Sequence, residues 1–316
     1  MPKTLLLSIL LPCLTTLAWA QGFPTPKGEF GTQWIHHPAA NDSTEVLFRH
    51  VYTSSAAPRQ ATITVATTGK MRVYFNERNI SRDLFLSSPR SSVQLHTFDV
   101  SRYLRPDSNV IAVWVAPIKG CPVQKQLSLE YYGSYDNQER FHHRANQAWS
   151  SLLLPHCHAT DSTETFDARE VPSNWKSTEY APLPGSWTAP QAETTHSPSL
   201  STWEICPTDS SLSLLNILQP IALQEDTHGI YVSFGRAFEG SLRITLRDAK
   251  KGEEIYIDGF TYICQGELDE QAFRYFSQSS QSTFYIYGDE RFDKKQIQRI
   301  EGLETRKVRN HSYLYP

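Results

Sequence analysis

Short segments in which apolar and polar residues alternate make up much of the chain, and they predict β-strands. Ala61, Ile63 and Val65 alternate with more polar neighbours, which is the two-residue period of a strand with one buried face. Similar segments are rich in β-branched and aromatic residues, and the predicted strands are 46–52, 61–67, 70–75, 93–100, 109–116, 229–234, 240–246, 254–264, 283–287 and 296–300. Turn residues rather than segments of helical period separate several of these strands. The pattern therefore predicts an all-β fold of antiparallel β-sandwiches or jelly rolls.

The strands fall into two groups, which predicts two domains in tandem. Between them lies a polar, proline-bearing stretch, 133–201, that is long for a connection inside a compact domain. We expect it to wrap around the first sandwich, with Trp149, Trp175 and Trp187 as hydrophobic anchors. The predicted parts are a first β-sandwich that includes the wrapping loop at 28–192, a second β-sandwich at 203–304 and a C-terminal tail at 305–316.

The composition is that of a globular protein and excludes several functions. The chain has 316 residues, enough for two domains that each bury a core, and 39% of the residues are hydrophobic. Its formal net charge is −3, and it has no basic stripe of the kind that nucleic-acid binding requires. No Gly-x-Ser-x-Gly, P-loop or His-Glu-x-x-His motif occurs. We therefore expect neither a nucleic-acid partner nor a cofactor.

Residues 1–20 have the features of a signal peptide for export. Lys3 supplies a positive start, 5–17 is a short apolar core, and the sequence Ala-Trp-Ala that ends at Ala20 is a signal-peptidase site. Cleavage is expected between Ala20 and Gln21, so the protein is expected to be secreted or periplasmic. No later segment has the roughly twenty consecutive apolar residues of a transmembrane helix.

The exported chain would keep four cysteines, which are Cys121, Cys157, Cys206 and Cys264. In an oxidising compartment four cysteines allow three disulfide pairings, and the sequence does not choose among them. Four buried free thiols are the alternative.

Three segments resemble one family of enzymes. The segment TFDAREVPSNWKSTEYAPLPGSWTA, 165–189, has an Asp-Ala-Arg triplet followed by two spaced tryptophans. The other two segments are HTFDVSRYLRPDSNVIAVWV at 96–115 and FGRAFEGSLRITL at 234–246. All three resemble the β-domains of bacterial α-L-rhamnosidases of the large inverting family, glycoside hydrolase family 78. The family's Gly-Trp-Tyr after the segment 96–115 is absent here, where Ala116-Pro117-Ile118 follows instead.

This resemblance implies a fold and a function. The fold would be an α-L-rhamnosidase N-terminal-like sandwich followed by a concanavalin-like sandwich, both of jelly-roll or galactose-binding-like type. In the family these domains accompany a helical (α/α)6 catalytic domain, which this chain is expected to lack. The resemblance thus implies an exported, non-catalytic carbohydrate-binding or accessory protein that acts in the recognition or breakdown of rhamnose-containing glycans. A separate glycoside hydrolase is a further expected partner.

The candidate ligand-binding residues come from the 165–189 segment. Asp167 and Arg169 can accept from and donate to sugar hydroxyls, and the rings of Trp175 and Trp187 can stack on a sugar face. Each has a structural alternative, because Asp167 and Arg169 could pair with each other and the tryptophans could simply anchor an irregular loop.

Two other functions remain open from the sequence. A minimal glycoside hydrolase or lyase acting on rhamnosylated polysaccharide would need paired carboxylates, for which Glu267 and Asp269 are the candidates, with Tyr262 nearby. A structural component of a cell-surface assembly would instead show a large exposed apolar patch.

The acidic stretch 266–270 has two further interpretations, a solvated turn or a structural Ca²⁺ site built from several oxygens. His142-His143 and His156-Cys157-His158 lack the ligand spacing of a structural zinc site. No metal is therefore expected, apart from that Ca²⁺ alternative.

Overall fold

The computed structural model describes residues 33–81, 85–87, 95–121, 123–194 and 211–308. Within these ranges the secondary structure is β-strands and single-turn 3-10 helices, which confirms the predicted all-β fold. No helix in the described part is long and apolar enough to cross a membrane. The predicted signal peptide, Cys206 and the end of the predicted tail from residue 309 lie outside the described residues. The 3-10 helices are η1 (Ser101–Tyr103), η2 (Val123–Lys125), η3 (Ala168–Glu170) and η5 (Lys294–Gln296).

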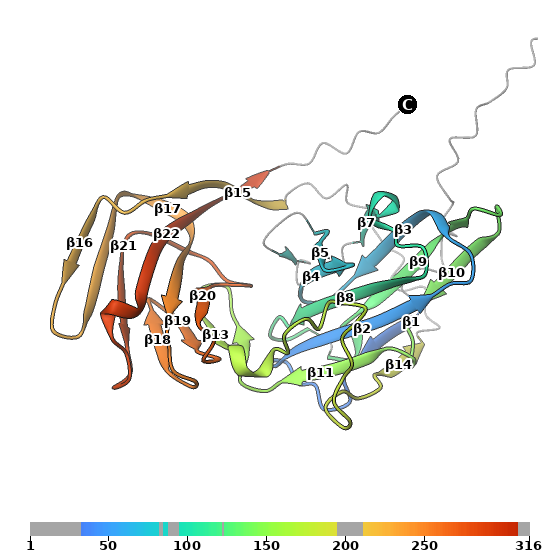
Figure 1. Cartoon of the computed structure of the whole chain (residues 1–316), viewed down its shortest axis with the longest axis horizontal. Helices are drawn as coiled ribbons and strands as arrows, with labels where there is room; N and C mark the ends of the chain where they lie inside the picture. Colours follow the sequence, from blue (N-terminus) through green and yellow to red (C-terminus); the bar gives the residue numbers. More distant parts are fainter. Residues whose placement is uncertain (1–32, 82–84, 88–94, 122, 195–210, 309–316) are drawn as a thin grey trace, which may run out of the picture.

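Two main sheets form the N-terminal part of the molecule, on the right in Figure 1. The four-stranded sheet has the order β10 (Arg140–Arg144), β9 (Ser128–Tyr135), β3 (Pro58–Ala66) and β7 (Leu95–Asp99). The six-stranded sheet has the order β11 (Ser150–Leu154), β2 (Glu45–Thr53), β8 (Ser108–Ala116), β4 (Lys70–Phe75) and β5 (Arg78–Asn79), with β6 (Leu86–Ser87) also paired to β4. A separate pair joins β1 (Gln33–His36) to β14 (Gln191–Thr194).

The two main sheets pack face to face, because each strand turns alternate side chains inward. Ile63 and Val65 on β3 meet Phe48 on β2 and Val113 on β8 in one buried cluster. This is the β-sandwich that the alternating pattern predicts.

The six-stranded sheet is buried on both faces. All six residues of β4 are buried, and apolar residues of β2, β4 and β8 that point away from the first core belong to a second one. Leu47, Tyr74 and Trp114 lie on this second face. Burial on both faces explains the nearly continuous apolar run at 109–116.

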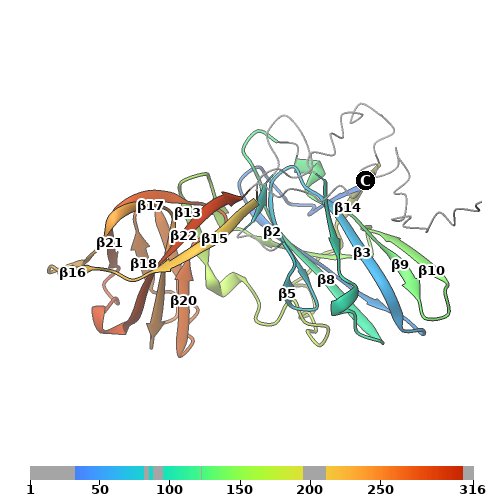
Figure 2. The same ribbon diagram turned by 90° about the horizontal axis from the view of Figure 1, so that it is seen from above.

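One curled ten-stranded sheet forms most of the C-terminal part, which Figure 2 shows from above. Its order is β12 (His158–Ala159), β13 (Glu164–Asp167), β19 (Phe260–Ile263), β18 (Glu254–Ile257), β21 (Ser279–Gly288), β17 (Gly229–Arg247), β22 (Ile297–Val308) and β15 (Ser211–Leu218), with β16 (Ala222–Glu225) and β20 (Asp269–Phe273) also paired to β17. All of its pairs are antiparallel except β13 with β19, which is parallel.

Several predicted boundaries differ from the observed ones. The predicted strands 229–234 and 240–246 are one strand, β17, which stays continuous across a register shift between Ser233 and Phe238. The predicted strand 254–264 is a hairpin, because Asp258 and Gly259 take positive φ angles of 36° and 79° and turn the chain. Strand β22 continues to Val308, so the first residues of the predicted tail belong to the sheet.

The predicted wrapping loop is more ordered than expected, and it crosses the predicted domain boundary. Within 133–194 the structure has strands β10 to β14, of which β10 and β11 extend the two sheets of the first sandwich. Strands β12 and β13 join the ten-stranded sheet instead, although they lie inside the predicted first domain of 28–192. The part of the loop from residue 195 to 201 lies outside the described residues.

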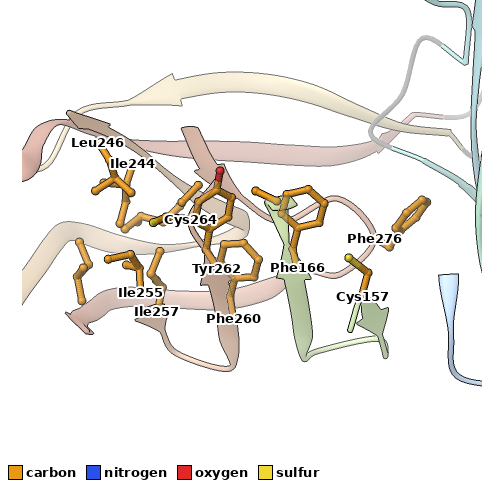
Figure 3. Close-up of a cluster of buried hydrophobic side chains, with 14 of the residues drawn as sticks. Cys157, Phe166, Ile244, Leu246, Ile255, Ile257, Phe260, Tyr262, Cys264 and Phe276 are labelled. Carbon is orange, nitrogen blue, oxygen red and sulfur yellow. The ribbon is translucent and has the colours of Figure 1, made fainter. Parts of the chain in front are cut away.

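A shared hydrophobic core joins the two parts. It holds residues of the ten-stranded sheet, such as Phe166, Tyr262 and Phe276, together with Trp114 and Leu47 of the six-stranded sheet. Figure 3 shows Phe166 on β13 beside Phe260 and Tyr262 on β19, with Phe276 and Cys157 further along the cluster.

Buried cations reinforce this junction. The Lys70 ammonium donates hydrogen bonds to the carbonyl oxygens of Thr160 and Phe276, at 2.9 and 2.8 Å. The Arg72 guanidinium donates to the Tyr275 carbonyl at 3.3 Å and lies over the ring of that tyrosine. Both cations come from β4, so the first sandwich holds the segment 274–277 in place.

Candidate functional site

The Asp167–Arg169 pair lies at the end of β13, where the chain enters η3. The Asp167 carboxylate accepts hydrogen bonds from the Arg169 backbone N–H at 3.0 Å and from its guanidinium Nε and Nη2 at 2.8 and 2.6 Å. Burial alone would raise the pKa of Asp167, but these hydrogen bonds outweigh it, and the pKa is lowered. The geometry therefore favours the structural alternative, in which Asp167 and Arg169 pair with each other and fix the loop.

The two tryptophans of the segment anchor its irregular loop. Trp175 is only 3% exposed, and its ring makes an edge contact with Tyr74, with centroids 5.8 Å apart. Trp187 is half-buried and donates its indole N–H to the Tyr180 hydroxyl at 3.1 Å. The Arg49 guanidinium also donates to the carbonyl oxygen of Trp175 at 3.0 Å, which fixes the loop to β2. Neither indole forms a freely exposed stacking platform.

A cavity of about 410 Å³ opens beside Trp175, between the 166–176 segment and the 262–275 segment. Aromatic side chains form part of its wall, and they are Phe166, Trp175, Tyr262, Phe273 and Tyr275. Polar side chains complete it, including Ser173, Asn174, Lys176, Gln265, Glu267, Asp269, Glu270 and Gln271. The structure thus brings Trp175 together with Glu267, Asp269 and Tyr262, whereas Asp167, Arg169 and Trp187 do not line the cavity.

The carboxylates of the cavity differ in what they can do. Glu270 is buried and holds the turn before β20, because it accepts from the Tyr262 hydroxyl at 2.9 Å and from three backbone N–H groups. Asp269 is exposed and pairs with Arg247 at 2.9 Å, and this hydrogen bond lowers its pKa. The exposed Glu267 has a single long contact, 3.5 Å, from the Ser173 hydroxyl.

These groups suit hydrogen bonding better than proton transfer. Asp269 stays ionised because Arg247 stabilises its charge, so it can accept from hydroxyl groups but is a poor general acid. Burial raises the pKa of Tyr262, which therefore remains a neutral phenol. Its hydroxyl already donates a hydrogen bond to Glu270. An aromatic wall with a rim of carboxylates and amides can hold a small polyhydroxylated molecule.

One group of side chains has the types of a metal site, although the sequence did not single out this set. Atoms of His156, Asp167 and Glu170 lie within 4.8 Å of one another, and His156 Nδ1 is 2.5 Å from Glu170 Oε1. However, Arg169 engages both carboxylate oxygens of Asp167. A cation at this position would have to displace that guanidinium.

The cysteines do not form disulfides in the described part of the chain. Cys121, Cys157 and Cys264 are free thiols, while Cys206 lies outside the described residues. Burial raises the pKa of Cys157 and of Cys264, so both thiols stay protonated.

Part of the cavity wall was not predictable from the sequence. Phe273, Tyr275 and Gln265 line it, but they lie about a hundred positions after the segment that carries Trp175. Their only local signal is the alternation along β20 and the residues that follow it, which indicates a strand without naming its neighbour.

Comparison with known proteins identifies the fold. No protein-family model matches the chain. A search of curated proteins finds no match either. Among solved structures, an α-L-rhamnosidase from Dictyoglumus thermophilum matches with a TM-score of 0.68 and 16% identity over 89% of this chain. A Streptomyces avermitilis α-L-rhamnosidase complexed with L-rhamnose has a TM-score of 0.68 and 18% identity over 84% of this chain, and one from Aspergillus terreus has 0.69 and 14% over 86%.

The chain has a fold that α-L-rhamnosidases contain. This confirms, at the level of the fold, the resemblance seen in the sequence. The match covers 35%, 29% and 36% of the three enzymes, so the chain spans about a third of the length of each. At identities below 20% the likeness concerns architecture, and function has to be argued from the site.

Proposed function

We propose that this protein binds carbohydrate in the cavity beside Trp175. The observation that carries the proposal is the composition of the cavity, which is lined by aromatic rings together with carboxylate and amide groups. A sugar ring has apolar C–H faces and hydroxyl edges, so it can place a face against Phe273 or Tyr275 and its hydroxyls against Glu267 and Asp269. The volume of about 410 Å³ is in the range of small-molecule sites.

The protein would act as an exported accessory in the recognition or breakdown of rhamnose-containing glycans. The likeness to α-L-rhamnosidases supports this glycan class, and one of the similar enzymes is complexed with L-rhamnose. The signal-peptide pattern of residues 1–20 supports export to the periplasm or the medium. A separate glycoside hydrolase is the partner that this role implies.

A minimal glycoside hydrolase or lyase is the second candidate function. It is favoured by one observation, that Glu267 and Asp269 line the same cavity. Against it stands the pairing of Asp269 with Arg247, since a glycosidase needs one carboxyl group with a raised pKa as general acid.

A different observation favours the third candidate function, a structural role in a cell-surface assembly. Exposed aliphatic side chains gather on β15, β16 and the turn between them, and they are Leu214, Leu215, Ile217, Ile221 and Leu223. Such a group is typical of a contact surface, but it lies apart from the cavity residues.

A glycan-binding screen run beside a hydrolysis assay tests the proposed function. We expect retention of rhamnosylated oligosaccharides without release of rhamnose. Turnover that disappears in Glu267→Gln would instead establish the hydrolase. Absence of both binding and turnover, with a folded protein, would favour the structural role.

A further inference from the structure

A row of four tyrosines crosses the outer face of the ten-stranded sheet. Tyr231 on β17 lies against Tyr285 on β21, Tyr285 against Tyr287, and Tyr287 against Tyr256 on β18, with ring centroids 4.4, 5.3 and 5.0 Å apart. The register explains the row, because Tyr231 is opposite Tyr285 and Tyr256 is opposite Tyr287. We call these four residues the tyrosine row.

The tyrosine row lies on the other side of the sheet from the shared core and the cavity. Side chains alternate along each strand, and Ile286 and Ile255, the neighbours of row residues, are fully buried in the core. Tyr231 and Tyr287 are 44% and 40% exposed, so their rings are accessible to a ligand.

Carboxylates accept hydrogen bonds from two of the four hydroxyls of the row. The Tyr285 hydroxyl donates to Asp226 at 3.1 Å, and the Tyr256 hydroxyl donates to Glu254. This contact with Glu254 raises the pKa of Tyr256 to about 12, so Tyr256 stays uncharged at neutral pH. Within the described chain, no protein group bonds the hydroxyls of Tyr231 and Tyr287, which remain able to donate and accept.

From this arrangement we propose that the tyrosine row is a second carbohydrate-binding surface, one that takes an uncharged polysaccharide chain. Rings and free hydroxyls fit a ligand that presents C–H faces and hydroxyl edges in alternation. Asp226 beside Tyr285 and Glu254 beside Tyr256 place carboxylates along the row, where they can accept from sugar hydroxyls and would repel an acidic chain. The neighbouring cation Lys294 is already paired with Glu225 at 3.0 Å.

The surface also continues toward the Asp167–Arg169 pair. Glu254 precedes Tyr256 on the same face of β18, and its charge acts on Arg169. The Arg169 and Arg291 guanidinium groups both lie beside Gly252, where an added Cβ would be 3.0 and 3.5 Å from their Nη1 atoms. A chain that follows the row would therefore reach donors as well as acceptors at this end.

The row consists of aromatic side chains with hydroxyl groups, whereas the exposed apolar residues of β15 and β16 are aliphatic. The cores of protein-docking surfaces are enriched in Trp, Phe, Met and Arg as well as Tyr, whereas the row consists of tyrosines alone. A protein partner is consequently an outcome of the test rather than part of the proposal.

Affinity gel electrophoresis tests this inference, which rests on the proposed function only in taking carbohydrate as the ligand. The probes are three soluble uncharged polysaccharides, a mixed-linkage β-glucan, a galactan and an arabinoxylan, with polygalacturonate as the acidic comparison. The test variant is Tyr231→Ala with Tyr287→Ala. Thr283→Ala, an exposed residue of β21 on the same face, is the matched control.

We expect at least one uncharged polysaccharide to retard the wild type and the control, with at least tenfold weaker binding by the double variant. Equal retardation of the double variant, tighter binding of polygalacturonate, or no retardation by any uncharged probe would overturn the proposal. If the double variant does not fold, nitration of wild-type tyrosines decides instead, because a bound chain must protect Tyr231 and Tyr287. Unprotected residues would likewise overturn it.

The same samples separate this inference from the proposed function. Titration with methyl α-L-rhamnoside reports on the cavity, so the double variant should bind that sugar like the wild type. Polysaccharide binding without rhamnoside binding would remove the cavity as the sugar site and leave the tyrosine row. Rhamnoside binding without polysaccharide binding would do the reverse.

Discussion

Glu45, on β2, is a carboxylic acid buried on the face of the six-stranded sheet that meets the shared core. Its Oε2 accepts from the Trp114 indole N–H at 2.7 Å. Burial raises the pKa of Glu45 well above its usual range, and the nearby Glu164 carboxylate adds to the effect. The folded protein therefore holds this proton more tightly than the unfolded chain, and its stability falls as the pH rises between the unfolded and folded pKa values.

Glu45→Gln removes this titration and should alter the pH dependence of stability. We expect the variant to gain of the order of 1 kcal/mol relative to wild type at pH 7, and the gain should shrink as the pH is lowered toward 4. Thermal unfolding across this pH range measures the effect. Glu139→Gln, an exposed residue, is the control and should follow the wild type. Parallel curves for Glu45→Gln and wild type would contradict this account.

The pKa of Asp167 shifts in the opposite direction from that of Glu45. Burial alone would raise it, but hydrogen bonds from Arg169 lower it. The contribution of Asp167 to stability is present above the unfolded pKa and is lost as the pH falls through the folded one. Asp167→Ala removes this contribution and the cap of η3, and it should cost about 1–2 kcal/mol at pH 7 in urea unfolding. The exposed Asp136→Ala should change stability by less than about 0.5 kcal/mol. Equal effects of the two would mean that the Asp167–Arg169 pair is not structural.

At the scale of elements, β4 shows what the sequence could and could not predict. Its bounds, Lys70–Phe75, match the predicted strand, because KMRVYF has strong β-propensity and a turn on either side. Burial of Lys70 and Arg72 on one face was not predictable, since cations normally indicate a solvated surface. Their partners are carbonyl groups about ninety and two hundred residues away, which no local pattern specifies.

Lys70→Met tests the connection that β4 makes between the two parts. The change keeps an apolar stem but leaves the carbonyl oxygens of Thr160 and Phe276 without this donor. We expect a loss of about 1–3 kcal/mol in the free energy of unfolding measured in urea. Lys119→Met, at an exposed position, should be close to neutral. A neutral Lys70→Met would show that the ammonium group does not hold the segment 274–277.

The long strand β17 limits prediction from the sequence in another way. The sequence marks two strands at 229–234 and 240–246, because Gly235 and Gly240 interrupt the pattern. In the structure the chain continues through both glycines as one strand, and an added Cβ at Gly240 would lie 1.9 Å from the Leu303 carbonyl oxygen. Close backbone approach, rather than a turn, is what this glycine permits.

At the scale of the whole molecule, the two parts share one core and should unfold together. Trp114 of the first sandwich lies 4.7 Å, centroid to centroid, from Tyr275 of the second part. Differential scanning calorimetry should therefore record a single transition with equal calorimetric and van't Hoff enthalpies. Trp114→Ala should lower the free energy of unfolding by about 3–5 kcal/mol and keep one transition. Two separate transitions in the wild type would show that the parts are independent.

The candidate site was only partly predictable because it is assembled from distant segments. The sequence singled out Trp175 for binding and Glu267 with Asp269 for catalysis, as parts of competing functions. The structure places all three on one cavity, since the 166–176 segment and the turn before β20 lie side by side. The chemistry of Asp167 and Arg169 suits sugar binding, yet their geometry makes them partners of each other.

A calorimetric titration of methyl α-L-rhamnoside into the full chain tests the central claim most directly. We predict saturable one-to-one binding that weakens about tenfold or more in Glu267→Ala, since a hydrogen bond to a charged group is worth about 1.5–3 kcal/mol. Glu290→Ala, an exposed glutamate outside the cavity, should bind like the wild type. Unchanged affinity in Glu267→Ala, or no binding by the folded wild type, would contradict a sugar site beside Trp175.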